Sequence, residues 1–449
     1  MVEETDFPRV LFVTPCAFNR ETGGGITFGN LFAGWPKDRL ATVHNDPVPV
    51  TRDVCEKYFR LTNNEIRRWI SKPGRRISDA SGANPSVLTD STSTHILRAA
   101  KFAKGLVFGN GLPERGVISE RLENWIRDFQ PDLMYSILGS NGILELVGEI
   151  QKSFRLPLAI HMMDDWPSTI YRGGVLSVFQ RRAMMRMVSE LMQKATSRIA
   201  ICDLMARVFE KRYGVPFVAY QNAVDLTRWA NFVKADMTVG DTLRILYVGS
   251  ILEFAQRYSL VDCCRAVAEL SAEGRSVELE IYSPDAADKL IRRELEIHDS
   301  ITIKGSISDD ERFFQTLSDA DLLVLPVNFD RRSVSYIRYS MPTKVPAYLA
   351  SGTPILVYGP MSVAQVEYAS REHWGEVVSQ QGVQNVKKAI LALLGDRERR
   401  TQLSIAARRA AQANHDKKAV CTAFQQTLFA ARAGRGPLSE TSGGSWQSA

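Results

Sequence analysis

The pattern of apolar and polar positions alternates short apolar runs with longer segments of helical period. Such alternation is typical of parallel sheets whose strands are joined by crossover helices. The runs are rich in Val, Ile, Leu, Phe and Tyr. They predict strands at residues 9–14, 132–137, 157–162, 197–202, 217–222, 243–249, 277–282, 301–305, 321–326 and 354–359.

The predicted strands fall into two sets with a connecting segment between them. Residues 231–242 show little apolar periodicity and fit an interdomain connection. We therefore expect an α/β fold of two Rossmann-like, doubly wound parallel-sheet domains at 1–232 and 243–415. Parallel sheets bind ligands at the carboxyl ends of their strands, so two facing domains would place the functional site in the cleft between them.

The end of the chain is predicted to be helical and then disordered. Val420, Phe424, Leu428 and Phe429 recur at helical spacing within 416–432. The tail that follows is polar and rich in small residues, so residues 433–449 are expected to be disordered.

Length and composition indicate a globular protein with more than one hydrophobic core. The chain has 449 residues, which exceeds what one core usually serves. It is 45% hydrophobic and 24% charged, close to the average for globular proteins. Its longest apolar runs are far shorter than the roughly 20 residues of a membrane-spanning helix, so no such helix is expected.

The N-terminus and the cysteines indicate a reduced, cytoplasmic protein. Acidic residues precede the first apolar run, without the basic region and cleavage site of a signal peptide. The cysteines are scattered, with no spacing typical of a disulfide framework or a zinc site. They are Cys16, Cys55, Cys202, Cys263, Cys264 and Cys421.

A basic segment departs from the α/β pattern. Residues 56–121 hold twelve Lys and Arg against six Asp and Glu, an excess equal to the formal net charge of +6 for the chain. Within it, residues 95–109 can form a basic amphipathic helix, which suits an anionic membrane surface. The alternative is a solvated rim of the domain. Nucleic acid is not expected as a partner, because no recognition module or basic-aromatic stacking platform is present.

Three glycines follow the first predicted strand. Gly23, Gly24 and Gly25 open a helix, and glycines there let backbone amides approach a phosphate or sugar. The spacing matches neither a dinucleotide-binding nor a P-loop motif. The alternative is a plain turn.

Polar residues also follow the strand at 157–162. His161, Asp164, Asp165 and Trp166 lie at its predicted carboxyl end. A carboxylate pair there can hold sugar hydroxyls, or one carboxylate can act as a base when its neighbour raises its pKa. The alternative is helix capping by Asp before Pro167.

The strongest candidate lies in residues 340–360. The pattern predicts a helix that begins near Pro342 or Thr343, a stop at Gly352 and then a buried strand. Lys344 in the first turn is unfavourable for the helix dipole, so a cation there points to an anion bound between Lys344 and the helix end. The alternative is an ordinary surface lysine.

A second phosphate contact is expected after the strand at 243–249. Gly249 and Ser250 end this strand, and Arg257 precedes the next helical segment. This is the natural position for a cation on the opposite wall of the same crevice. Arg257 could equally be exposed.

Six motifs occur in a characteristic order. They are GGG at 23–25, YQNAVDLTRW at 220–229, YVGSI at 247–251, KGSISDDE at 304–311, SDADLLVLP at 318–326 and PTKVPAYLASGTPILVYGP at 342–360. Together they resemble retaining glycosyltransferases of the GT-B fold, family 4 in particular, over about residues 8–430.

The resemblance implies transfer of a sugar from a nucleotide-diphosphate sugar to a hydroxyl of a glycan or lipid-linked acceptor. Retention by same-face attack, without a bound metal or other cofactor, is implied as well. The second domain would bind the donor, the first domain would bind the acceptor, and the last helix would cross back onto the first domain. Cell-envelope polysaccharide or glycolipid synthesis at the inner face of the membrane would be the setting.

The candidate residues take roles from this interpretation. The catalytic candidates are Lys344, Arg257, Asp164 and His161. The donor-binding candidates are Gly249, Ser250, Pro342, Thr343, Lys344 and Tyr348. The acceptor or diphosphate loop comprises Gly23, Gly24, Gly25, Asp165 and Trp166, and the hinge comprises Asn222 and Asp225.

One departure from the family pattern leaves alternatives open. Family members usually carry two glutamates around the donor helix, one for the sugar hydroxyls and one for the ribose, and Tyr339 and Ala347 stand in their places here. Either Lys344, Thr343 and residues 329–340 hold the donor differently, or the chain is a non-catalytic scaffold or binding subunit. A nucleotide-sugar 2-epimerase is a further alternative, whose acids we cannot place.

Overall fold

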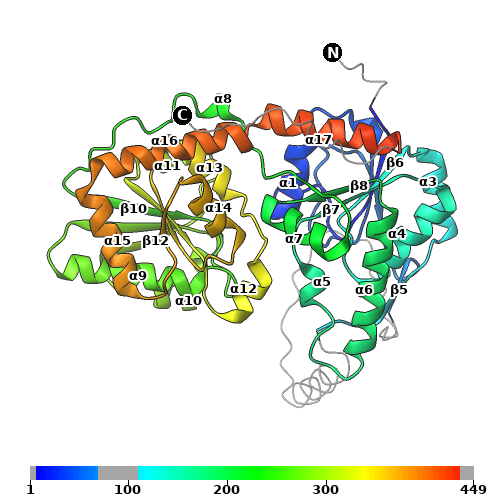
Figure 1. Ribbon diagram of the computed structural model, residues 1–449, viewed down its shortest axis with the longest axis horizontal. Coiled ribbons are helices and arrows are strands. Elements are labelled where there is room, and N and C mark those ends of the chain that lie inside the picture. Colours follow the sequence, from blue (N-terminus) through cyan, green and yellow to red (C-terminus); the bar gives the residue numbers. More distant parts are fainter. Residues whose placement is uncertain (1–6, 69–109, 435–449) are drawn as a thin grey trace.

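The computed structural model of the protein describes residues 7–68 and 110–434, which form two α/β domains (Figure 1). The predicted amphipathic helix at 95–109 and nearly all of the predicted disordered tail lie outside the described residues.

The first domain is built on a parallel sheet with strand order β3-β2-β1-β6-β7-β8-β9. These strands are β1 (Val10–Val13), β2 (Leu40–His44), β3 (Lys57–Arg60), β6 (Leu133–Ser136), β7 (Leu158–Met162), β8 (Ser197–Ala200) and β9 (Val218–Ala219). A separate antiparallel pair comprises β4 (Ile66–Arg68) and β5 (Glu114–Gly116). The helices are α1 (Gly23–Leu31), α3 (Glu120–Phe129), α4 (Asn141–Phe154), α5 (Trp166–Thr169), α6 (Ser177–Lys194), α7 (Asp203–Tyr213) and α8 (Leu226–Trp229).

The second domain repeats this design with strand order β12-β11-β10-β13-β14-β15. Its strands are β10 (Leu243–Val248), β11 (Val277–Tyr282), β12 (Ile301–Lys304), β13 (Leu322–Pro326), β14 (Ile355–Tyr358) and β15 (Glu376–Val378). Its helices are α9 (Arg257–Ala272), α10 (Lys289–Leu295), α11 (Asp310–Asp319), α12 (Arg331–Ile337), α13 (Lys344–Ser351), α14 (Ala364–Glu372), α15 (Val383–Gly395) and α16 (Arg397–Asn414).

Each sheet reverses its strand order at one point. The reversal falls between β1 and β6 in the first domain and between β10 and β13 in the second. Loops diverge at such a point and leave a crevice at the carboxyl ends of the strands. The glycines after β1, Gly249 after β10 and the start of α13 therefore lie at the two crevices.

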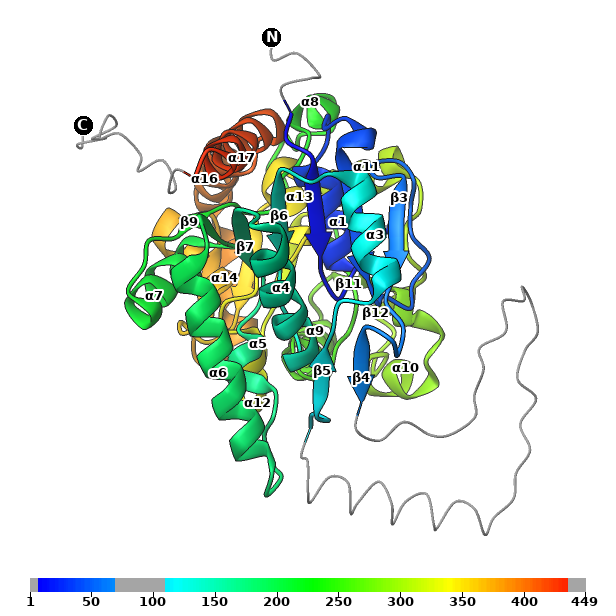
Figure 2. The same ribbon diagram turned by 90° about the vertical axis from the view of Figure 1, so that its right-hand side faces the viewer.

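The central strands are buried along their whole length. Every residue of β1, β6, β7, β13 and β14 is buried. Helices cover both faces of the first sheet (Figure 2). Because neither face meets water, these strands read as continuous apolar runs rather than alternating ones.

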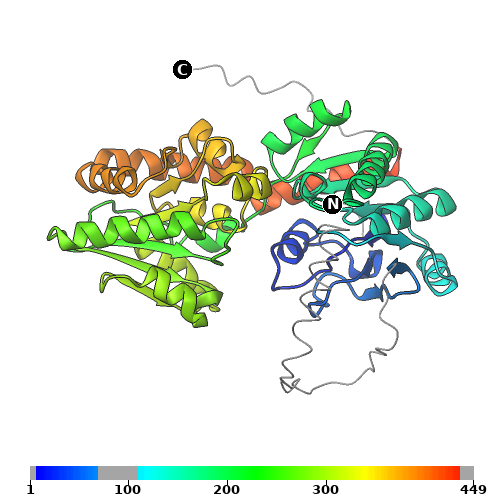
Figure 3. The same ribbon diagram turned by 90° about the horizontal axis from the view of Figure 1, so that it is seen from below.

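The last helix, α17 (Lys417–Arg432), returns from the second domain to the first, as Figures 1 and 3 show. Phe424 and Leu428 on its inner face are fully buried in the first-domain core with Phe32 and Tyr135. The hydroxyl of Tyr220 also donates a hydrogen bond to the carbonyl oxygen of Ala423 at 3.0 Å.

The predicted α/β fold class is confirmed, and each predicted strand overlaps an observed one. The sequence missed β2, β3, β15 and the β4–β5 pair. β3 is an edge strand with a charged residue at each end, and β4, β5 and β15 have three residues each, too few for a clear period. Among the helices of residues 7–68 and 110–434, none is long and apolar enough to cross a bilayer.

Candidate functional site

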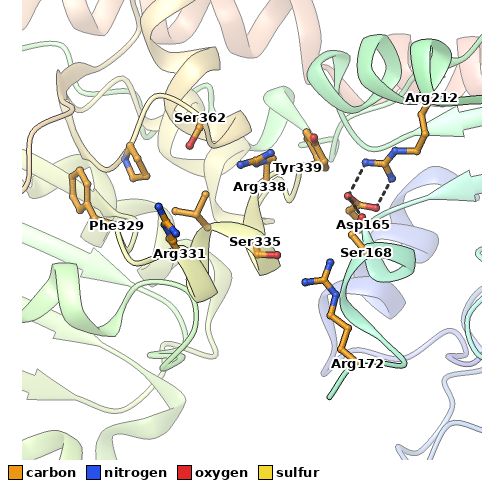
Figure 4. Close-up of a pocket in the computed structure, with 12 residues that line it drawn as sticks. Asp165, Ser168, Arg172, Arg212, Phe329, Arg331, Ser335, Arg338, Tyr339 and Ser362 are labelled. Atoms are coloured by element: carbon orange, nitrogen blue, oxygen red, sulfur yellow. Dashed lines mark hydrogen bonds and ion pairs between the residues drawn. The ribbon is translucent and has the colours of Figure 1, made fainter. Parts of the chain in front are cut away.

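A cavity of about 540 Å³ lies between the two domains (Figure 4). First-domain residues reach it from α5 and the residues on either side of it and from α7. Second-domain residues reach it from α12, from the residues directly after α12, and from the loops after β13 and β14. The lining residues are Asp165, Ser168, Arg172, Arg212, Phe329, Arg331, Val334, Ser335, Arg338, Tyr339, Pro360 and Ser362.

Asp165 is fixed within the wall of this cavity. Arg212 donates two hydrogen bonds to its carboxylate, at 2.7 and 3.0 Å, and Ser168 donates a third at 2.7 Å. Burial alone would lower the pKa of Arg212, but the hydrogen bonds and charge of Asp165 outweigh burial and raise it. Because Arg212 compensates its charge, we expect Asp165 to have a structural role in the wall of the cavity.

Asp164 joins the two domains. The hydroxyl of Ser340 in the second domain donates to its Oδ1 at 2.8 Å. Asp164 is exposed as a residue, but protein atoms close to its carboxyl group partly desolvate it. This desolvation raises the pKa of Asp164, and the hydrogen bond from Ser340 opposes the rise. An accessible carboxylate with a raised pKa is suited to accept a proton or to bind a hydroxyl.

His161 lies in the core and does not line the cavity. Its side chain is fully buried, and its Nδ1 shares a hydrogen bond with the hydroxyl of Tyr135 at 2.6 Å. Burial lowers its pKa to about 3, so the imidazole stays neutral. Trp166 begins α5 beside the cavity and is only partly buried.

The three glycines form the first turn of α1. Thr22 caps this helix by accepting a hydrogen bond from the amide of Gly25 at 3.2 Å. A Cβ at Gly25 would lie 2.5 Å from the side chain of Asn19, and one at Gly23 would lie 3.9 Å from Thr343 of the second domain. Gly25 is therefore needed for its close contact with Asn19 of the same domain, whereas Gly23 faces the start of α13.

Lys344 occupies the first turn of α13, as predicted. Its ammonium group donates to the hydroxyl of Tyr247 at 2.8 Å and lies 4.0 Å from the centroid of that ring. A Cβ at Gly249 would lie 2.5 Å from Nζ, so the ammonium rests directly on the end of β10. Within the described residues no carboxylate pairs with it.

This placement is electrostatically unfavourable. Lys344 is half-buried with no counter-charge from the described residues, and desolvation lowers its pKa to about 7. Pro346 in the same turn has no N–H group, so the amides of the helix end contribute less to an anion site than the sequence suggested. The side chain of Lys344 is therefore the main positive group at this crevice.

The other donor-side candidates surround Lys344. Tyr348 is buried, and its hydroxyl accepts a hydrogen bond from the amide of Val248 at 2.8 Å, which fixes the end of β10. The carbonyl oxygen of Ser250 accepts from Tyr247 at 2.6 Å. Pro342 is half-buried and Thr343 is exposed at the start of α13.

Arg257 is already paired. Its Nε donates to Oε2 of Glu294 on α10 at 2.7 Å, and it does not line the cavity. This ion pair compensates the charge of Arg257 and occupies two of its nitrogens, which weakens the case for Arg257 as a diphosphate ligand.

The hinge candidates connect three parts of the molecule. Asn222 accepts a hydrogen bond from Thr27 at 2.6 Å and donates one to the carbonyl oxygen of Met341 at 3.0 Å. Its own carbonyl oxygen accepts from the buried His415 at 2.7 Å. Asp225 caps α8 through the amide of Thr227 at 3.1 Å.

Tyr339 and Ala347, which the sequence resemblance aligns with two glutamates, differ in their surroundings. Tyr339 is buried against Phe209 of the first domain, with ring centroids 6.0 Å apart. Ala347 is half-buried on α13. Tyr339 thus forms an aromatic contact between the two domains.

The sequence did not single out the individual arginines of the cavity. Arg331 and Arg338 fall within residues 329–340, where no motif distinguishes one arginine from another, and Arg172 follows α5 without a motif. Among groups of His, Cys, Asp and Glu in the described part of the chain, none is arranged to hold a metal ion.

Comparisons with known proteins give likeness in structure only. No protein-family model and no curated sequence matches the chain. HepE of Anabaena, in complex with UDP, superposes with a TM-score of 0.59 at 12% identity over 93% of this chain and 99% of its own. Sucrose-phosphate synthase of Thermosynechococcus elongatus gives 0.60 at 14% identity over 94% and 99%.

WaaG, a glycosyltransferase involved in lipopolysaccharide biosynthesis, gives a TM-score of 0.56 at 11% identity over 94% of this chain and 98% of its own. At such identities the likeness concerns the fold. The chain therefore has the two-domain GT-B fold of glycosyltransferases.

Proposed function

We propose that the protein is a glycosyltransferase that moves a sugar from a nucleotide-diphosphate sugar to an acceptor hydroxyl, with retention and without a metal ion. The fold supports glycosyl transfer in general, because structures with the same fold include HepE in complex with UDP-glucose. WaaG supports an acceptor in polysaccharide or glycolipid synthesis.

The observation that carries the proposal is the uncompensated ammonium of Lys344. It lies at the carboxyl end of β10, where a doubly wound sheet binds its ligand, and no described carboxylate neutralises it. A diphosphate placed there would supply the missing negative charge. The same ammonium would stabilise the charge that develops on the leaving β-phosphate.

The acceptor side is proposed to lie at Asp164 and the start of α1. Asp164 is accessible and already binds a hydroxyl, that of Ser340. We assign it to orienting the acceptor hydroxyl, while the leaving phosphate takes the proton in a same-face attack. Gly23 supports this assignment because it faces Thr343 at the start of the donor helix.

The test is release of nucleoside diphosphate from a panel of UDP, GDP and dTDP sugars by the purified protein. Slow hydrolysis of one donor is expected, with Lys344→Met lowering the rate at least tenfold. Loss of an oxyanion-stabilising group typically costs about 3–4 kcal/mol of barrier. An unchanged rate in Lys344→Met would remove Lys344 from the mechanism.

A second candidate function is a non-catalytic, glycosyltransferase-like binding subunit. It is favoured by Tyr339, which packs against Phe209 where the family has a sugar-binding glutamate. This candidate predicts no release of nucleoside diphosphate from any donor, even when the protein is shown to be folded.

A further inference from the structure

The interdomain cavity carries an excess of positive charge. Four arginines and one aspartate are its charged lining residues, and Asp165 is compensated by Arg212. Arg172, Arg331 and Arg338 are exposed to the cavity, and none of them pairs with a carboxylate of the described residues. Three guanidinium groups from two domains thus share one hollow, and no carboxylate of residues 7–68 or 110–434 pairs with them (Figure 4).

Other arginines along the same domain boundary are paired. Arg371 binds Asp203 at 3.1 Å, and Arg207 binds Glu367 at 3.3 Å. Arg228 near the hinge binds Asp310 at 2.8 Å. The unpaired arginines are therefore a local property of the cavity.

The loop that presents Arg172 is rigidly built. Tyr171 before it is buried in a left-handed conformation with φ of +54°, which is rare for a bulky residue. The hydroxyl of Tyr171 accepts from the amide of Asn141 at 2.9 Å. The amide of Arg172 donates to Asn110 at 2.7 Å, and its carbonyl oxygen accepts from Asn110 at 3.0 Å. Backbone strain of this kind persists where the surroundings fix it, often at ligand sites.

The second-domain arginines are also held by their backbones. Arg331 begins α12, which Asp330 caps, and the carbonyl oxygen of Arg338 accepts from the amide of Ala364 at 2.7 Å. Ser335 and Ser362 and the aromatic residues Phe329 and Tyr339 also line the cavity. Serine hydroxyls and aromatic side chains suit a carbohydrate, and arginine forks suit a phosphate.

We infer that this cavity binds a phosphate group carried by the acceptor, so that the substrate is a phosphorylated carbohydrate. The inference rests on the proposed function and specifies the chemical class of its acceptor. Lys344 does not line the cavity, so we assign the cavity arginines to a phosphate other than those of the donor. A phosphate bound by Arg172, Arg331 and Arg338 would bridge both domains.

The test is calorimetric titration of the full chain with glucose 6-phosphate, with glucose as the uncharged reference. The double variant Arg172→Gln, Arg338→Gln should bind glucose 6-phosphate at least about tenfold more weakly, because charge-assisted hydrogen bonds are lost. Arg332→Gln is the matched control, since Arg332 lies on α12 beside Arg331 but stacks over Phe254 and does not line the cavity. Equal loss of binding in the control would overturn the inference.

A second arm identifies the source of the phosphate. Phosphatidylcholine vesicles with and without decaprenyl phosphate are sedimented with the same variants. Arginine-dependent binding to the decaprenyl phosphate vesicles supports a lipid-linked acceptor, and arginine-dependent binding of glucose 6-phosphate supports a free one. Absence of arginine-dependent binding in both arms overturns the inference.

A failure of the proposed function can be distinguished from a failure of the inference about the cavity. Titration of the same proteins with UDP, GDP and dTDP reports the donor site, where Lys344→Met is the sensitive variant. Phosphate binding that depends on the arginines, without any nucleotide binding, would contradict the transferase while leaving the anion site in place.

Discussion

At the scale of single residues, the environment decides what each side chain can do. Lys344 and His161 were both expected in the catalytic machinery. Lys344 lies half-buried at a crevice without a counter-charge, whereas His161 lies fully buried and bound to Tyr135. A strongly shifted pKa marks a functional site only when the group is also accessible. The lowered pKa of Lys344 therefore points to a functional group, whereas the lowered pKa of His161 reflects burial in the core.

The pKa of Lys344 predicts a pH dependence for nucleotide binding. The free protein carries a charged Lys344 below about pH 7, and a bound diphosphate stabilises that charged form. Affinity for a nucleoside diphosphate should therefore fall as pH rises above 7, by up to about tenfold per unit. Titrations between pH 7 and 9 should show this fall in the native protein and none in Lys344→Met. A parallel fall in both would assign the dependence to another group.

The buried His161–Tyr135 pair predicts a loss of stability without a loss of binding. His161→Leu leaves the hydroxyl of Tyr135 unsatisfied, which costs about 1–3 kcal/mol of unfolding free energy. Adding Tyr135→Phe should recover most of that loss. Denaturant unfolding and nucleotide titration on both variants check this. Weakened nucleotide binding in the double variant would show that His161 acts on the site.

At the scale of elements, the start of α13 and the end of β10 form one unit. Sequence reasoning placed Lys344 near the start of this helix and Gly352 at its end, and the structure agrees. Helix limits are predictable because capping and glycine preferences are local. The contact of Lys344 with Tyr247 and Gly249 is not local, since it joins segments about a hundred positions apart, and the sequence alone could not show it.

The contact between Gly249 and Lys344 predicts that one added methyl group at position 249 changes both stability and nucleotide binding. Gly249→Ala adds a Cβ that meets Nζ of Lys344, at a residue with φ of +135°. Gly274→Ala is the control, because φ is +82° there and nothing lies within 4 Å. Each substitution should cost about 1–2 kcal/mol of stability from backbone strain. Only Gly249→Ala should also weaken nucleotide binding, and equal binding by both variants would contradict the proposed donor site.

The returning helix α17 predicts a strong dependence of the first domain on the chain's last helix. Phe424 is fully buried there, whereas Gln426 on the same helix is exposed. Phe424→Ala should lower the unfolding free energy by about 3–5 kcal/mol, and Gln426→Ala by less than about 0.5 kcal/mol. Guanidinium unfolding followed by tryptophan fluorescence measures both. A small effect of Phe424→Ala would mean that α17 is not part of the first-domain core.

At the scale of the whole molecule, the two domains meet along a bonded boundary. Asp164 with Ser340, Arg371 with Asp203 and Asn222 with Met341 all join first-domain and second-domain residues. The fold class was predictable, because strand and helix periods repeat twice along the chain. The cavity was not, because Arg172 and Arg338 are brought together only by the docking of two domains, and no local pattern encodes that docking.

The role of Lys344 is tested by calorimetric titration of the native protein and Lys344→Met with UDP, GDP and dTDP. One nucleoside diphosphate should bind the native protein, and Lys344→Met should bind it at least tenfold more weakly. Failure of all three to bind the folded native protein, or equal binding by the variant, would contradict the claim that Lys344 neutralises a donor diphosphate.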